Sequence, residues 1–332
     1  MINKEVKLAK WVFTKEIELK AARDAVGEAL VEAGEKDERV VVLTADLKES
    51  TRVHLFAERF PERFFDCGVA EQALVTIASG LANYGKIPFI ASYAVFSPGR
   101  NWEQIRTTVC LNNVPVKILG MHAGLSAGPY GATHQSLEDL ALMRVLPNIT
   151  IVAPADFEET KKAILAAAKS TKPVYIRVVR EAIPAFTQPK SLFKIGKAEM
   201  FWQAKSPQVA IIACGAQVYE SLLVAKELEK KGLEILVINC HTIKPLDNQV
   251  IIRAAKTCGA IVTVEEHQIT GGLGSAVVEV LSRNFPAPIE SLGVNDVFGE
   301  SGKYLELLKK HDLTKEGIIE AVKRVIARKQ EN

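Results

Sequence analysis

The stretch Phe64-Phe65-Asp66-Cys67-Gly68-Val69-Ala70-Glu71-Gln72 joins a short apolar strand, a tight glycine turn and the beginning of a helix. The helix is predicted to run from Glu71 to about Gly85, because glycine is common just after a helix C-terminus. Apolar residues recur on one face of this helix at helical spacing, namely Leu74, Ile77, Ala78, Leu81 and Ala82. By itself, a carboxylate in the first helical turn, as at Glu71, is explained by the helix macrodipole.

Apolar strand-like runs alternate with amphipathic runs along the whole chain, which indicates an α/β fold with parallel sheets. Strands are predicted over 40–44, 64–67, 88–90, 116–120, 150–153, 174–178, 209–214, 233–239 and 260–265. Further helices are predicted over 21–33, 156–169, 218–230 and 248–258, with Asp156 as an N-cap. The segment 184–207 contains three prolines and no clean periodicity, so we interpret it as the linker and edge of a second domain. The 332 residues suit two domains, 1–188 and 189–332, at about 150 residues each.

The composition, 48% hydrophobic and 24% charged, is that of an ordinary globular protein. A net charge of +3, with Lys and Arg dispersed, is too small to suggest nucleic acid or a membrane surface as a partner. No apolar run reaches the roughly 20 residues of a membrane span, and residues 1–20 lack the apolar block of a signal peptide. We therefore expect a cytoplasmic protein.

The five cysteines are scattered and form neither a Cys-x-x-Cys motif nor a Cys/His cluster with zinc spacing. An odd number without a framework indicates reduced, mostly buried thiols. We expect no redox chemistry and no metal site built by this chain alone.

A second informative segment is His122-Ala123-Gly124-Leu125-Ser126-Ala127-Gly128-Pro129-Tyr130-Gly131-Ala132-Thr133-His134-Gln135-Ser136, hereafter the histidine loop. It follows the predicted strand 116–120, and ligands of parallel α/β sheets bind at the carboxyl ends of strands. The imidazoles of His122 and His134 are therefore predicted to project into a crevice, although a single histidine is more often structural. Glycines in the loop permit unusual backbone angles and the close approach of a ligand.

The turn Gly271-Gly272-Leu273-Gly274-Ser275 opens another helix and superficially suggests a dinucleotide site, but its spacing and position are wrong for one. Close packing or a domain contact is the favoured interpretation. Glu265, Glu266 and His267 precede this turn. They could be catalytic, but strand-end hydrogen bonds or a subunit contact are favoured.

The motif Gly68-Val69-Ala70-Glu71-Gln72 closely resembles the pyrimidine-domain motif of transketolases and deoxyxylulose-phosphate synthases, which are thiamine diphosphate enzymes. The histidine loop, closed by Gly131-Ala132-Thr133-His134-Gln135, resembles that of transketolases. The resemblance covers about 21–180 and continues more loosely to about 281. It implies a thiamine diphosphate pyrimidine-binding domain over 1–188 and a transketolase C-terminal domain over 189–332.

The resemblance also implies roles for individual residues. The family's glutamate hydrogen-bonds the aminopyrimidine ring of the cofactor and starts catalysis, and its two loop histidines bind sugar oxygens and assist proton transfer. Catalytic roles accordingly fall on Glu71, His122 and His134. Cofactor contacts fall on Glu71, Leu47, Tyr93 and Phe96. Substrate contacts fall on Arg23, Ser50, His122, Tyr130, His134 and Arg180, with the two arginines as phosphate ligands.

Two positions depart from the family pattern. Gly99 stands where a third aromatic residue often completes the ring pocket. Tyr130 stands where transketolases usually have an aspartate that reads the substrate's 2-hydroxyl group, and Asp139 is interpreted as a helix residue rather than a replacement. The sugars that the protein accepts therefore stay open.

A Gly-Asp-Gly segment followed by Asn, which usually holds Mg²⁺ and the diphosphate, is absent from the sequence. The chain thus resembles only the C-terminal half of a transketolase, either an inactive relic or one subunit of a split enzyme. The retained glutamate, aromatic residues and histidines favour a subunit of a split enzyme over an inactive relic. We expect an α2β2 assembly in which an N-terminal subunit supplies the diphosphate and Mg²⁺ site, and a two-carbon ketol unit passes between sugar phosphates.

Three alternatives remain. A deoxyxylulose-phosphate synthase-like half is close in the Glu71 segment but tends to lack a histidine at the position of His122. The β subunit of a thiamine-dependent 2-oxoacid dehydrogenase usually carries His-Ser-Gln-Ser where this chain has Thr133-His134-Gln135-Ser136. A non-catalytic scaffolding subunit would not depend on Glu71 for activity.

Overall fold

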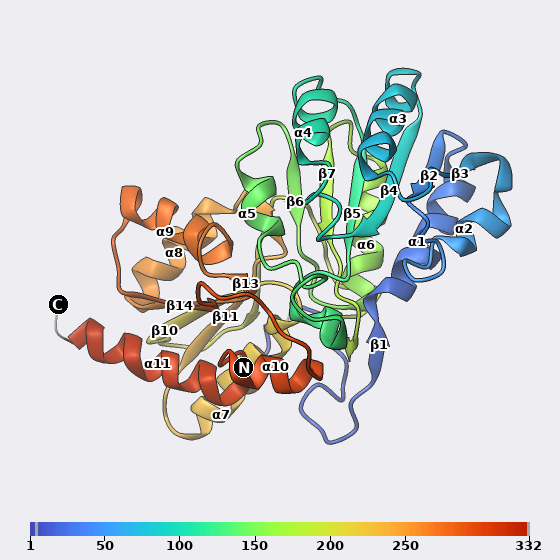
Figure 1. Cartoon of the computed structure of the whole chain (residues 1–332). Helices are drawn as coiled ribbons and strands as arrows, with labels where there is room; N and C mark the ends of the chain where they lie inside the picture. Colours follow the sequence, from blue (N-terminus) through green and yellow to red (C-terminus); the bar gives the residue numbers. More distant parts are fainter. Residues whose placement is uncertain (4–5, 331–332) are drawn as a thin grey trace.

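The computed structural model describes residues 1–3 and 6–330, and it contains two α/β units built on mainly parallel sheets (Figure 1). A seven-stranded sheet forms most of the first unit and a five-stranded sheet forms the second. A short antiparallel pair, β1 (Leu19–Ala21) with β8 (Ala182–Pro184), forms a separate two-stranded sheet. The predicted fold class, two parallel-sheet α/β domains, is confirmed.

The first sheet has the strand order β12-β6-β7-β5-β4-β2-β3, and all its neighbours are parallel except β12 and β6. Its strands are continuous apolar runs because both faces are covered by helices. In β2, for example, Val40 and Val42 pack on one face while Val41 and Leu43 pack on the other. The strands are β2 (Val40–Thr44), β3 (Phe64–Asp66), β4 (Ile87–Tyr93), β5 (Lys117–Met121), β6 (Thr150–Val152), β7 (Val174–Arg177) and β12 (Thr242–Lys244).

The helices of the first unit form a layer on each face of this sheet. One layer consists of α1 (Ala22–Lys36), α2 (His54–Arg59) and α6 (Phe157–Ala168). The other consists of α3 (Glu71–Asn83), α4 (Trp102–Gln104), the π-helical turn η2 (Ile105–Cys110) and α5 (Asp139–Arg144). Two short 3₁₀ segments, η1 (Pro61–Arg63) and η3 (Gly124–Tyr130), lie in the connections.

The second sheet has the order β14-β13-β10-β11-β9, and only its edge strand β9 runs antiparallel. Its strands are β9 (Glu199–Trp202), β10 (Val209–Ala213), β11 (Ile235–Asn239), β13 (Ile261–Gln268) and β14 (Ile289–Val294). One face packs on α7 (Gln217–Lys230) and α11 (Lys315–Gln330), and the other on α8 (Asn248–Cys258) and α9 (Leu273–Asn284). The short helix α10 (Tyr304–Lys310) lies beside η3 of the first unit.

The two units share a hydrophobic core. Ile118 and Leu140 of the first unit belong to the same buried cluster as Ile212 and Ile238 of the second. Strand β12, which follows β11 in the chain, crosses over and pairs with β6 of the first sheet. This crossover was not predicted from the sequence, and the division at 188/189 stays a prediction.

Most predicted elements are observed with ends shifted by one to three residues. Asp156 caps α6 as predicted, because its carboxylate accepts a hydrogen bond from the Glu159 backbone amide at 3.0 Å. The segment 184–207 contributes the edge strand β9, in agreement with its interpretation as a domain edge. One detail of the α3 prediction is wrong: Ile77 is 45% exposed, and the buried face instead includes Val75.

Within the described ranges, no helix is both long and apolar enough to cross a membrane. The five cysteines are unpaired, and four of them are buried.

Candidate active site

Glu71 is the first residue of α3, and its carboxylate is buried although it begins a helix (4% exposed). The turn that precedes it needs glycine, since Gly68 has a φ of +65°. Both carboxylate oxygens lie 3.3 Å from Nη1 of Arg100, and the Asn101 side chain donates to the Glu71 carbonyl at 3.0 Å. The carboxylate is therefore held in one place at the end of the sheet rather than left in solvent.

An aromatic cluster lies beside this carboxylate, because the Arg100 guanidinium also stacks over Phe96 at 4.0 Å. Phe96 stacks on Tyr93 with ring centroids 5.8 Å apart, and Tyr93 stacks on His122 at 4.2 Å. His134 contacts Tyr93 and Phe96 edge-on at 6.1 and 5.4 Å. The predicted aromatic and histidine residues are thus brought together from the end of β4, the turn that follows it and the histidine loop.

The histidine loop is held in a fixed shape by backbone hydrogen bonds. The Gly124 amide donates to the Ser136 carbonyl, which ties the beginning of the loop to its end, and the Ala123 amide donates to Val178 beyond β7. Gly128 and Gly131 adopt φ values of +60° and +72°, which non-glycine residues rarely do. The loop therefore presents its two histidines from a rigid base.

His122 is 1% exposed, and neither of its ring nitrogens meets hydrogen-bond geometry with a described residue. Burial, together with the charges of Arg23 and Arg180, lowers the pKa of His122 to about 3, and a weak opposing effect of the Ser50 backbone does not offset this. The imidazole is therefore neutral at physiological pH and presents one unpaired donor and one unpaired acceptor. Such atoms are expected where a polar ligand binds.

We expect His122 to stay unprotonated down to about pH 4. Its folded-state pKa lies below the ordinary value, so the unfolded chain binds more protons and stability falls as pH drops from 6.5 toward 3. One such histidine contributes at most about 1.4 kcal/mol per pH unit to that slope. An NMR titration of the imidazole signals, with His122→Asn to assign the resonance, checks this. A midpoint near 6.5 would contradict it.

The two predicted phosphate ligands lie near His122. Arg23 and Arg180 both act on the pKa of His122, and burial with the charges of Arg52 and Arg180 lowers the pKa of Arg23. The buried Nε atoms of Arg23 and Arg180 lack hydrogen-bond partners among the described residues. Arg52, held by Asp24 at 2.6 Å, is a further cation here that sequence reasoning missed. Its position two residues after Ser50, itself predicted to contact the substrate, was the available signal.

Leu47 and Ser50 follow β2 in a turn stabilised at Asp46, whose amide donates to the Asp66 carboxylate at 2.9 Å. Leu47 packs in the same hydrophobic cluster as Tyr93 and Phe96. The Ser50 hydroxyl donates to the Leu47 carbonyl at 3.3 Å, so it is engaged within the turn. Both residues therefore lie at the predicted end of the sheet.

Tyr130 is half exposed and stacks on His134 with centroids 5.3 Å apart. The Arg180 guanidinium lies over the same ring, 5.1 Å from its centroid, and also pairs with Glu181. The ring thus contacts both a predicted catalytic histidine and a predicted phosphate ligand. Asp139 does not replace the usual aspartate, because it is fully buried and bound to Tyr175 and Arg177.

Gly99 is required by the local backbone rather than by the ring pocket. A Cβ atom there would lie 1.9 Å from the Val95 carbonyl oxygen, so no aromatic residue fits without rearranging this turn. Arg100, the next residue, contacts Glu71 and Phe96 instead.

Glu265, Glu266 and His267 lie near the end of β13 and make hydrogen bonds there. This is one of the two interpretations that the sequence favoured. Glu265 accepts the Leu273 and Gly274 amides at 2.6 and 2.8 Å, and a Cβ on Gly272 would lie 1.9 Å from its Oε2. The glycine-rich turn is therefore needed for close packing. Glu266 contacts the histidine loop, and His267 Nε2 accepts the Ala141 amide at 3.3 Å.

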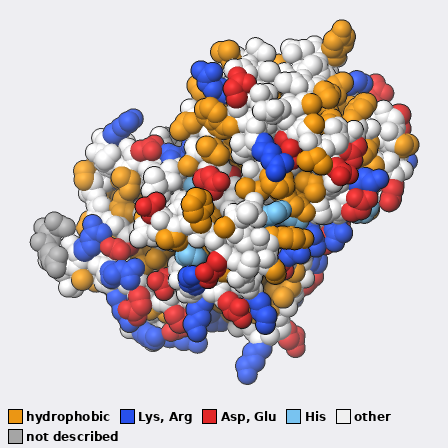
Figure 2. Space-filling view, in the orientation of Figure 1, with side chains coloured by type: hydrophobic (Ala, Val, Ile, Leu, Met, Phe, Trp, Pro, Cys, Tyr) orange, Lys and Arg blue, Asp and Glu red, His pale blue; other side chains and the backbone are white. Residues whose placement is uncertain are grey.

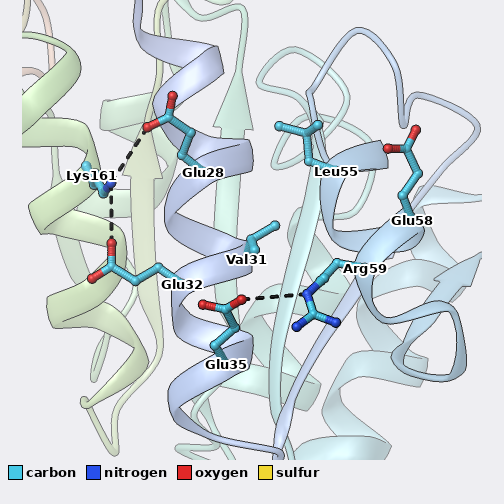
Figure 3. A pocket seen from close by; sticks show the side chains of 8 residues that line it. All are labelled: Glu28, Val31, Glu32, Glu35, Leu55, Glu58, Arg59 and Lys161. Atoms are coloured by element: carbon cyan, nitrogen blue, oxygen red, sulfur yellow. Dashed lines mark ion pairs between the residues drawn. The ribbon is translucent and has the colours of Figure 1, made fainter.

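A surface cavity between α1, α2 and α6 lies apart from these residues (Figure 3). Four glutamates outnumber the two cations of its lining, and both cations are paired: Lys161 lies 3.6 Å from Glu28 and 3.3 Å from Glu32, and Arg59 lies 3.6 Å from Glu35. An anionic substrate or cofactor has no uncompensated positive charge to bind there.

The site residues fit thiamine diphosphate in part. A buried carboxylate beside stacked aromatic rings suits an aminopyrimidine ring. Across residues 1–3 and 6–330, no group of three or more His, Cys, Asp or Glu side chains is arranged to hold a metal ion. The described residues thus offer a place for the ring but no carboxylate cluster for the Mg²⁺ that accompanies the diphosphate.

Comparison with known proteins finds two domain models of one enzyme family along the chain. Residues 19–185 match the family model of the transketolase pyrimidine-binding domain, and residues 196–318 match that of the transketolase C-terminal domain. A chain from Methanocaldococcus jannaschii, assigned by name as a transketolase C-terminal section, is 42% identical over 91% of this chain and 95% of its own length. The 6-deoxy-6-sulfo-D-fructose transketolase subunit SqwH from a Clostridium species is 38% identical over 92% of this chain and 95% of its own length.

A solved structure, titled as a split gene transketolase in an inactive β4 tetramer, superimposes with a TM-score of 0.86. It is 44% identical, and the match covers 92% of this chain and 98% of that one. The chain belongs to the transketolase family and corresponds to its C-terminal section, with the pyrimidine-binding and C-terminal domains.

Proposed function

We propose that this chain is the C-terminal subunit of a split transketolase, which transfers a two-carbon ketol unit between sugar phosphates when joined to an N-terminal subunit. The observation that carries the proposal is a set of buried polar atoms without partners. Among the described residues, both ring nitrogens of His122 and the Nε atoms of Arg23 and Arg180 are of this kind; His122 stacks on Tyr93 of the aromatic cluster, and the two arginines act on its pKa. Unpaired buried atoms of this kind are costly unless a ligand satisfies them.

Each site residue has a separate task in the proposed reaction. Thiamine diphosphate, when bound, supplies the stabilised carbanion that the chemistry needs. The Glu71 carboxylate would hold a proton against the pyrimidine ring, while Tyr93, Phe96 and Leu47 would position the cofactor. His122 and His134 bind the sugar oxygens, and His134 moves a proton to or from them.

The anionic end of the substrate is assigned to Arg23, Ser50 and Arg180. A guanidinium fork recognises the tetrahedral oxygens of phosphate, and the same geometry accepts a sulfonate. One relative acts, by its name, on a sulfonated fructose. Tyr130 contacts both His134 and Arg180, so it is assigned to the part of the sugar between the reacting carbons and the anionic group.

Dependence on a partner is supported by two observations besides the missing metal ligands. The related split-gene structure is titled as an inactive tetramer of one chain. Apolar side chains are also exposed on β3, on the turn before Glu71 and along α3: Phe65 (40%), Val69 (70%), Ile77 (45%) and Tyr84 (91%). Figure 2 shows hydrophobic side chains over this part of the surface. We infer that these side chains are covered in an α2β2 assembly whose other subunit provides the diphosphate and Mg²⁺ site.

The test combines this chain with the N-terminal transketolase subunit of its host, in the presence of thiamine diphosphate and Mg²⁺. We expect ketol transfer from a ketose phosphate to an aldose phosphate by the mixture and none by either chain alone. A sulfonated ketose serves as a second donor. Turnover by this chain alone would refute the partner requirement.

Other outcomes identify the alternatives. Condensation of pyruvate with an aldose phosphate would favour a deoxyxylulose-phosphate synthase-like half. Decarboxylation of pyruvate without sugar transfer would favour a 2-oxoacid dehydrogenase subunit. The five unpaired cysteines support a reducing compartment such as the cytoplasm, which we propose as the location.

A further inference from the structure

Glu266 belongs to the second α/β unit, yet its buried side chain reaches the histidine loop. Oε1 accepts the backbone amide of Ser126 at 2.9 Å, across 140 residues of sequence. Oε2 accepts the hydroxyl of Tyr304 at 2.6 Å, and the Glu266 carbonyl accepts Nη2 of Arg177 at 2.7 Å. The carboxylate is 3% exposed and is therefore fixed by partners on both sides.

Ser126 connects Glu266 by hydrogen bonds to two parts of the site. Its hydroxyl donates to the Ala123 carbonyl at 2.6 Å, next to His122. The same hydroxyl accepts the backbone amide of Arg180 at 2.9 Å. A shift of Ser126 would therefore move both the beginning of the histidine loop and the arginine assigned to the anionic group.

The loop is shaped to admit the Glu266 carboxylate. A Cβ atom on Gly124 would lie 2.4 Å from Oε1 of Glu266, and Gly124 has a φ of +71°, so only glycine fits both the space and the backbone angle. A second tie lies nearby, where Nε2 of Gln135 donates to the Glu300 carbonyl at 2.9 Å. The second unit thus holds the histidine loop by hydrogen bonds at two points, the Ser126 amide and the Gln135 side chain.

We propose that Glu266 is a positioning residue for the sugar-phosphate site, through which the C-terminal domain sets the placement of the histidine loop and of Arg180. The inference rests on the proposed function, since that function assigns the loop to the substrate. It gives the C-terminal domain a part in substrate geometry although none of that domain's residues was predicted as a site residue.

The test compares Glu266→Ala with Glu265→Ala in the reconstituted complex. Both glutamates are buried neighbours that accept backbone amides, but the partners of Glu265 lie in its own unit, at the start of α9. Both replacements should lower the midpoint of urea unfolding. Only Glu266→Ala is expected to lower kcat/KM for the sugar phosphate, by about 100-fold, because displacing catalytic groups by about 1 Å has that effect.

Three further readouts separate positioning from general destabilisation. Glu266→Gln keeps an acceptor for Ser126 and should retain activity within about fivefold, the difference between a charged and a neutral hydrogen bond. The Kd of thiamine diphosphate should change much less than kcat/KM in Glu266→Ala, because the residues assigned to the cofactor all lie on segments other than the histidine loop. Hydrogen exchange at the Ser126 amide of the isolated chain should accelerate in Glu266→Ala but not in Glu265→Ala.

Equal kcat/KM values for the two alanine variants per folded molecule, or unchanged exchange at Ser126, would overturn the proposal. If Glu266→Ala does not fold, Tyr304→Phe removes one hydrogen bond to the same carboxylate, and a loss of about tenfold in kcat/KM is expected. A wild-type complex without ketol transfer would refute the proposed function, whereas the exchange experiment would still decide whether Glu266 positions the loop.

Discussion

Glu71→Gln is expected to lower kcat for ketol transfer about 1,000-fold in the reconstituted complex, within the range for a positioned proton-transfer group. Glutamine has nearly the same shape but cannot hold the proton that the proposed chemistry places on the pyrimidine ring. The replacement also removes the charge that pairs with Arg100 at 3.3 Å, so the stability of the chain is measured beside the kinetics.

The measurement is steady-state kinetics at saturating thiamine diphosphate, together with the urea midpoint of the isolated chain. Glu35→Gln is the matched control, since Glu35 lies on the surface of α1 and pairs loosely with Arg59 at 3.6 Å. We expect this control to keep full activity. A Glu71→Gln complex that retained most of its activity would exclude the catalytic role and favour the scaffolding alternative.

The features that the sequence predicted well are local ones. The strand, turn and helix around Glu71 are specified within about twenty residues, by an apolar run, a glycine with positive φ and a helix that ends before Gly85. Asp156 was recognisable as an N-cap because its partner is three residues away. Strand positions were predictable because strands covered on both faces are continuous apolar runs.

The features that the sequence did not predict depend on distant parts of the chain. Ile77 shares a helix with buried residues, but whether a borderline position is covered depends on what packs beside the helix. The crossover of β12 into the first sheet, and the contact of Glu266 with Ser126, join residues about 90 and 140 positions apart. Arg52 and Arg100 were missed because surface solvation is the ordinary explanation for a lone arginine.

The resemblance supplied the site residues, and the structure adds their physical setting. It brings His122, Tyr93, Phe96 and His134 into one aromatic cluster. It also shows that Tyr130, which stands where the family usually has an aspartate, makes contacts of its own: the ring stacks on His134 and lies under Arg180. The roles of these residues stay proposals until the variants are measured.

Asp139→Ala is expected to reduce the free energy of unfolding by about 3–5 kcal/mol, the usual cost of leaving a buried ionic partner uncompensated. Asp139 is fully buried and accepts hydrogen bonds from Tyr175 Oη at 2.7 Å and from Arg177 Nε at 3.0 Å. Its removal leaves the Arg177 guanidinium, which is also buried, without its nearest carboxylate.

The matched control is Glu279→Ala, which breaks another arginine–carboxylate pair at a similar distance, 2.9 Å from Nη2 of Arg144. The Glu279 side chain is 59% exposed, so water replaces the lost partner and the expected cost is below about 1 kcal/mol. Urea unfolding followed by circular dichroism measures both changes. Equal costs for the two variants would mean that water reaches Arg177. The Asp139–Arg177 pair would then contribute little to the stability of the contact between β7, α5 and β13. Other contacts would have to hold the end of the histidine loop, where Arg177 donates to the Ser136 carbonyl.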